Sequence, residues 1–139
     1  TRISVQSGEL GKYMAWKSDD AYIPAGAMTS DISDMLSYAQ MNLEKNPYLA
    51  DTHTSLKMAD ASTDDYKLMD INIDEIGMAW AIDKENGIIW HAGGTDNYNS
   101  YLAFNLENKT AVIVLSNLPP SYRIPSVVLG VKLLLELGA

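Results

Sequence analysis

The clearest helical pattern lies between residues 30 and 47. Apolar side chains recur there three or four residues apart, which predicts a helix with one apolar face. They are Ile32, Met35, Leu36, Ala39 and Leu43. Thr29 or Ser30 is the expected N-cap, and Pro47 is expected to end the helix because proline cannot continue it.

A second helical stripe lies near the C-terminus. Its apolar positions are Ile124, Val127, Val128, Val131, Leu134 and Leu135. Pro125 suits the first helical position, and Gly138 suits the C-cap. Gly130 lowers the helix propensity inside the stripe, but it permits close packing on a sheet.

Four strands are expected between these helices, at residues 77–82, 88–91, 101–105 and 110–117. The first two are joined by "DKENG", in which Asn86 and Gly87 supply the positive φ that a hairpin turn needs. The last two flank the short turn "LENK". The pattern predicts an α+β fold, in which an antiparallel meander is covered by the C-terminal helix and preceded by a helical segment.

Residues 51–75 follow neither periodicity and carry seven of the acidic residues. An irregular stretch of this length is unusual inside a domain. We therefore expect it to pack against something, such as a part of the protein outside these 139 residues.

Composition adds limits rather than a function. A chain of 139 residues, 47% hydrophobic and 20% charged, suits one globular core. A net charge of −8 with scattered basic residues argues against nucleic-acid binding, and the absence of cysteine excludes disulfides and thiol catalysis. The longest apolar stretch is interrupted by Lys132 and Glu136, so no membrane span is expected.

Most chemical motifs are missing. His53 and His91 are far apart and the aspartate pairs lack EF-hand spacing, so neither a metal nor a cofactor is expected. We expect His53 at the surface. Gly93 and Gly94 match no phosphate-binding loop, and no G-x-S-x-G nucleophile motif is present. The three tryptophans are expected to line the core or a cleft.

The stretch "IIWHAGGTDNYNSYLAFN" breaks an apolar strand at His91 and two glycines. It is either a tight turn with an incidental histidine or a strand edge left open for a ligand. The extended segment "HAGGTDNYNSYLAFNLENKTAVIVLSN" resembles the third motif and following strands of the serine β-lactamase and penicillin-binding-protein-like hydrolases, most closely the class C and esterase-like branch. The matching residues are His91, Ala92, Gly93, Thr95, Tyr98, Ser100 and Asn117. Upstream, "IPAGAMTSDISDMLSYAQ" is similar to the same family's Pro-Ala-Gly segment and capped helix.

The resemblance implies a β-lactamase/transpeptidase-like fold and acyl-enzyme hydrolysis of a β-lactam, ester or peptide. His91, Gly93 and Gly94 would take the catalytic positions: His91 where many relatives carry Lys, Gly93 leaving space for the ligand, and Gly94 offering its backbone N–H to the oxyanion. Asn97 and Tyr98, together with Thr95, would bind substrate.

The family's Ser-x-x-Lys and Tyr-x-Asn motifs do not occur in these residues. The resemblance therefore implies that residues 1–139 form a single C-terminal portion of a larger catalytic domain, with helix and irregular segment in 1–75 and strands plus helix in 76–139. The N-terminal portion of the same enzyme would be its partner and supply the nucleophile, so the chain alone would be inactive.

Three further expectations follow from the same resemblance. The protein would act outside the cytoplasm, in the periplasm or at the cell surface. A sheet edge left uncovered would allow a homodimer. The alternative function is a non-catalytic, degenerate module that binds a peptide or cell-wall ligand at the same strand edge.

Overall fold

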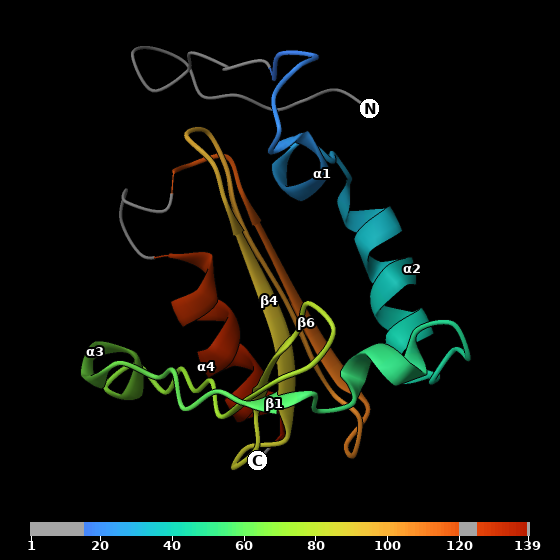
Figure 1. The fold of residues 1–139 in the computed structure, drawn as a ribbon. Helices are drawn as coiled ribbons and strands as arrows, with labels where there is room; N and C mark the ends of the chain where they lie inside the picture. Colours follow the sequence, from blue (N-terminus) through green and yellow to red (C-terminus); the bar gives the residue numbers. More distant parts are fainter. Residues whose placement is uncertain (1–15, 120–124, 139) are drawn as a thin grey trace.

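Six antiparallel strands form one sheet, ordered as they occur along the chain (Figure 1). The computed structural model describes residues 16–119 and 125–138. The strands are β1 (Lys57–Met58), β2 (Glu75–Ile76), β3 (Ala81–Asp83), β4 (Ile88–Gly94), β5 (Asn99–Asn105) and β6 (Thr110–Ser116). The antiparallel meander and the α+β class expected from the sequence are confirmed.

Two long helices cover opposite faces of the sheet (Figure 1): α2 (Ile32–Leu43) on one face and α4 (Ser126–Gly138) on the other. Successive side chains of a strand point to opposite faces. In β4, Ile88 and Trp90 therefore join the core beneath α4, whereas Ile89 joins the core beneath α2. The shorter helices are α1 (Ile23–Gly26), the 3-10 turn η2 (Ala50–His53) and α3 (Asp64–Lys67).

Each face of the sheet has its own buried cluster. The cluster beneath α4 consists of Ile71, Ile88, Trp90, Tyr101, Ala103, Val112, Val131 and Leu134. The cluster beneath α2 consists of Ala39, Trp80, Ile89, Leu102 and Phe104. Strand β5 contributes to both clusters and six of its seven residues are buried, so it is the strand most completely enclosed by the fold.

Helix α2 has the predicted span but different end signals. Its N-cap is Asp31, not Thr29 or Ser30, and the Asp31 carboxylate accepts hydrogen bonds from the backbone N–H groups of Ser33 and Asp34. The helix ends at Leu43, before Pro47, because Lys45 takes a left-handed conformation with φ of 54°. The helix therefore ends at Leu43 and not at Pro47, so proline is not what terminates it.

Helix α4 is fixed to the sheet at its first turn and its middle. Pro125 precedes the first helical residue, Ser126, whose backbone N–H donates to the side-chain oxygen of Asn99 on β5 at 2.8 Å. Gly130 faces Tyr101 so closely that an added Cβ would lie 2.0 Å from a ring carbon. The expected close packing at Gly130 is therefore confirmed. Gly138 is the last helical residue rather than a residue beyond the helix, and Ile124 lies outside the described residues.

Several predicted strand boundaries were wrong. Residues 77–80 form a turn between β2 and β3, so the strand expected at 77–82 begins only at Ala81. Strand β4 does not stop at His91 but continues to Gly94, because β5 begins earlier than expected and pairs with it at Asn99 and Ser100. In the β3–β4 turn, Gly87 has a positive φ and Asn86 does not.

The segment 51–75 packs on this chain's own sheet, which answers the expectation that it needs another partner. It contributes β1 and the first residue of β2, and it buries Ile71 at 1% exposure in the cluster beneath α4. Its lack of periodicity reflects elements of two to four residues, which are too short to establish a repeat.

Candidate functional site

Strand β4 has an open edge over its second half. Strand β3 pairs only with Ile88, Ile89 and Trp90, whereas β5 pairs with β4 along its whole length. Among the described residues, no strand lies against the β3 side of His91–Gly94. His91, Gly93 and Gly94 therefore lie in a strand and not in a tight turn.

The ladder shows which backbone groups face this edge. The N–H of Thr95 donates to the carbonyl of Tyr98 at 2.9 Å and closes the β4–β5 hairpin. Hydrogen-bonded and non-hydrogen-bonded pairs alternate along an antiparallel ladder. The pairs Gly94–Asn99 and Ala92–Tyr101 are consequently non-hydrogen-bonded. The N–H and C=O groups of Gly94 and Ala92 thus point away from β5, toward the open edge.

A shallow hollow of about 330 Å³ lies along this edge. Its lining comes from the β2–β3 turn, the start of β3 and the middle of β4: Ile76, Ala79, Trp80, Ala81, Trp90, His91 and Ala92. His91 is the one titratable side chain in this lining. An apolar wall with one polar group and unpaired backbone donors is the usual makeup of a small-ligand site.

His91 is exposed, and its ring meets the buried indole of Trp80. The two ring centroids are 6.5 Å apart and the planes lie at 87°, an edge-to-face arrangement. The sequence identified His91 but assigned Trp80 only to a core or cleft lining. The contact between them depends on the β2–β3 turn, which no sequence signal placed beside β4.

Gly93 lies opposite Ser100 on the neighbouring strand. A Cβ at this position would lie 2.6 Å from the side-chain oxygen of Ser100 on the neighbouring strand. The glycine therefore leaves room for the Ser100 hydroxyl in its present rotamer. The contact with Ser100 explains a glycine at position 93 without any ligand.

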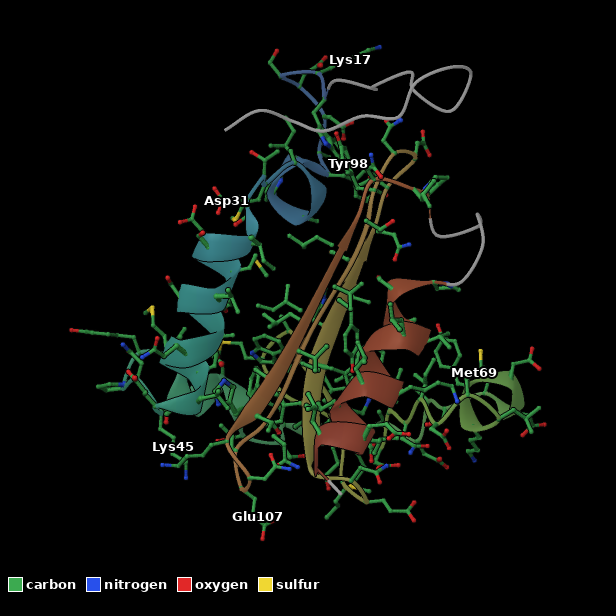
Figure 2. The ribbon with its side chains drawn as sticks, turned by 180° about the vertical axis from the view of Figure 1, so that it is seen from behind. Lys17, Asp31, Lys45, Met69, Tyr98 and Glu107 are labelled. Carbon is green, nitrogen blue, oxygen red and sulfur yellow. The ribbon has the colours of Figure 1, made fainter. Side chains whose placement is uncertain are left out.

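The three predicted substrate-binding residues lie around the tip of the β4–β5 hairpin. The Thr95 hydroxyl accepts a hydrogen bond from the N–H of Tyr98 at 3.2 Å and stabilises the turn. Asn97 is 7% exposed, and Tyr98 is partly buried at the end of the sheet nearest α1 (Figure 2). The Thr95 hydroxyl thus has a role in the turn, and little of the Asn97 side chain is open to a ligand in this arrangement.

His53 is buried, not at the surface as the sequence suggested. Its Nε2 lies 2.7 Å from the Asn42 side-chain oxygen, and because the Asn42 amide donates to the Tyr38 carbonyl, His53 is the donor. Burial lowers the pKa of His53 from its ordinary value of 6.5. His53 is buried because η2 packs against α2, and the sequence alone did not predict that contact.

No group of three or more metal-ligating side chains occurs in residues 16–119 and 125–138. In the same part of the chain, no helix is long and apolar enough to span a bilayer.

Fold and site together define a class: an α+β protein whose antiparallel meander lies between two helices and presents an open strand edge. A family model described as Beta-lactamase matches residues 3–127 of the 139. This match spans most of the chain, and the chain belongs to the β-lactamase family. No individual curated protein shows significant similarity to it.

Proposed function

We propose that this chain forms one wall of the acyl-transfer cleft of a β-lactamase-family serine hydrolase acting outside the cytoplasm. The observation that carries the proposal is the open edge of β4, where the backbone of Gly94 faces away from β5. A backbone N–H fixed in a sheet is a preorganised donor. Such donors stabilise the oxyanion of a tetrahedral intermediate because they need no reorientation during reaction.

His91 supplies the polar side chain of this wall. It is exposed beside the hollow, where a neutral imidazole can orient a substrate carbonyl or a neighbouring hydroxyl by hydrogen bonding. The scissile bond of a β-lactam, ester or peptide would lie along the edge between His91 and Gly94. Its carbonyl would accept from Gly94 when a serine attacks it.

The nucleophile would come from the N-terminal portion of the same enzyme, because no Ser-x-x-Lys or Tyr-x-Asn occurs in these residues. Exposed apolar side chains support such a partner. On α2 and the segment before it, Met28 is 89%, Ile32 48% and Leu36 57% exposed. Strand β6 is an edge strand of the described sheet, which can accept a further strand.

The first experiment measures acylation by a fluorescent penicillin. The 139-residue chain alone should remain unlabelled, whereas the chain joined to a segment carrying Ser-x-x-Lys and Tyr-x-Asn should be labelled on that segment's serine. A covalent mass increase on this chain alone would contradict the division of roles.

The second experiment removes the proposed donor within the joined enzyme. Gly94→Pro deletes the edge-facing N–H, and the fold should tolerate it because that N–H makes no bond to β5. The acylation rate should fall by about 10²–10³-fold. Gly94→Ala keeps the N–H and is the matched control. Equal acylation by the two variants would refute the oxyanion role.

The alternative is a non-catalytic module that binds an extended peptide or cell-wall fragment at the same edge. The observation favouring it is that the N–H and C=O groups of Ala92 and of Gly94 both point toward the open edge. An added strand requires donors and acceptors in this alternating pattern. In that case the 139-residue chain alone would bind peptide, Gly94→Pro would weaken binding, and the joined protein would show no acylation.

A further inference from the structure

Trp80 lies between the two histidines of the chain. Its ring centroid is 6.0 Å from that of buried His53 and 6.5 Å from that of exposed His91. It also meets Phe104 at 5.1 Å within the cluster beneath α2. One aromatic side chain therefore joins the hydrophobic core to the polar group of the candidate site.

The indole is fixed from its far side. Trp80 Nε1 donates to the Thr52 hydroxyl at 3.2 Å, and that hydroxyl donates to the Leu49 carbonyl at 2.6 Å. The backbone repeats the connection, because the N–H of Met78 donates to the Thr52 carbonyl at 2.9 Å. The β2–β3 turn is thus tied to η2 by both a side chain and the main chain.

The β2–β3 turn contains a strained backbone conformation next to Trp80. Ala79 has φ of 63°, the left-handed region that glycine prefers, immediately before Trp80. A Cβ on Gly77 would lie 2.7 Å from the Thr52 carbonyl oxygen. Such strain persists where surrounding contacts determine the conformation, and it often occurs at functional sites. Here the contacts determine where the Trp80 ring lies.

His91 itself is held weakly. Among the described residues its ring contacts Trp80 and makes no hydrogen bond to another side chain or to the backbone, and it is exposed. An exposed imidazole without a fixed neighbour would populate several rotamers. The perpendicular indole restricts this freedom, because rotation about χ1 would remove the edge-to-face contact.

We propose that Trp80 is a positioning residue for His91. It holds the imidazole at the open edge of β4, so that the polar group is ordered before a substrate arrives. This inference rests on the proposed function, in which His91 orients the reacting groups. Ordering a side chain in advance removes an entropic cost from binding and reaction.

The test is nuclear magnetic resonance of the 139-residue chain labelled at histidine and tryptophan. Wild type should show cross-relaxation between the Trp80 and His91 rings and χ1 couplings of a single His91 rotamer. Trp80→Leu should abolish the cross-relaxation and average the couplings. Thr52→Val keeps the indole but removes its anchor, and it should weaken the cross-relaxation in a chain that stays folded.

Trp90→Phe is the matched control. It also changes a buried tryptophan, but Trp90 packs on Tyr101 at the opposite face of β4 and donates to the Asn72 carbonyl. His91 couplings should be unchanged in this variant. Averaged couplings in wild type, or couplings unaltered in Thr52→Val and in a folded Trp80→Leu, would overturn the proposal.

The enzyme joined to its nucleophile segment separates this inference from the proposed function. If Trp80 acts through His91, Trp80→Leu should slow acylation no further in a His91→Gln background, since coupled residues are not additive. Additive losses would overturn the positioning role. Ordered His91 couplings in an enzyme that never acylates would refute the proposed function and leave the positioning of His91 intact.

Discussion

Gly130→Ala is the substitution whose effect follows most directly from the packing of α4. An added Cβ would lie 2.0, 2.4 and 2.9 Å from three ring carbons of Tyr101. Tyr101 is 1% exposed and its ring meets Trp90, so the ring has no open space to enter. The helix or the ring must therefore shift.

Two opposing terms set the magnitude. Overpacking of a buried position costs about 1–3 kcal/mol, and three close ring contacts place this site at the upper end. Alanine gains about 1 kcal/mol over glycine in helix propensity. The expected net loss is about 2 kcal/mol, or roughly a 30-fold change in the ratio of folded to unfolded chain.

Urea unfolding followed by tryptophan fluorescence measures this loss. Gly138→Ala is the matched control in the same helix, because its added Cβ would meet only the end of the Asn108 side chain at 2.8 Å. It should be neutral or slightly stabilising. A Tyr101→Leu background should reduce the cost of Gly130→Ala. Unchanged or increased stability of Gly130→Ala would refute the packing argument.

Three further predictions concern the surroundings of the site. Burial lowers the pKa of His53, so as the pH falls the imidazole is protonated in the unfolded chain before it is protonated in the folded chain. The free energy of unfolding should therefore be constant above pH 6.5 and decline as the pH falls through 6.5 toward the lowered pKa. His53→Gln should remove this slope and His91→Gln should retain it, as measured by urea unfolding from pH 5 to 8. Asn99→Ala should cost about 1 kcal/mol of unfolding free energy, because Ser126 at the start of α4 loses its acceptor. Gly93→Ala should cost about 1 kcal/mol by overpacking, and Ser100→Ala should restore most of it.

Each of these predictions has an outcome that contradicts it. Identical pH slopes for wild type and His53→Gln would show that His53 does not titrate differently on folding. Full stability of Asn99→Ala would show that water replaces the cap. A Gly93→Ala defect that persists in the Ser100→Ala background would assign Gly93 to something other than its contact with Ser100.

Local signals in the sequence were enough for the main elements. Apolar spacing gave the span of α2, and alternating and β-branched residues gave the four longer strands in their meander order. The pattern from His91 to Asn117 indicated the family whose model matches residues 3–127. These features succeed because each depends on residues close together along the chain.

Boundaries and short elements depended on contacts instead. Strand β4 extends to Gly94 only because β5 lies beside it, and the irregular segment forms the edge strand β1 and the start of β2 only because β2 pairs with both β1 and β3. His53 is buried because η2 returns to α2. The periodicity of one segment records only which of its residues are apolar, not which other segment packs or pairs beside it.

The sequence by itself determined the fold class and the family, and it predicted His91 as the polar residue of the candidate site. The tertiary structure alone decided that no strand of the described residues pairs with the β3 side of β4 beyond Trp90, and that Trp80 lies against His91. The physical reason is that the residue type fixes what a group can do, whereas its backbone partners and neighbouring rings are set by segments that meet only after the chain has folded.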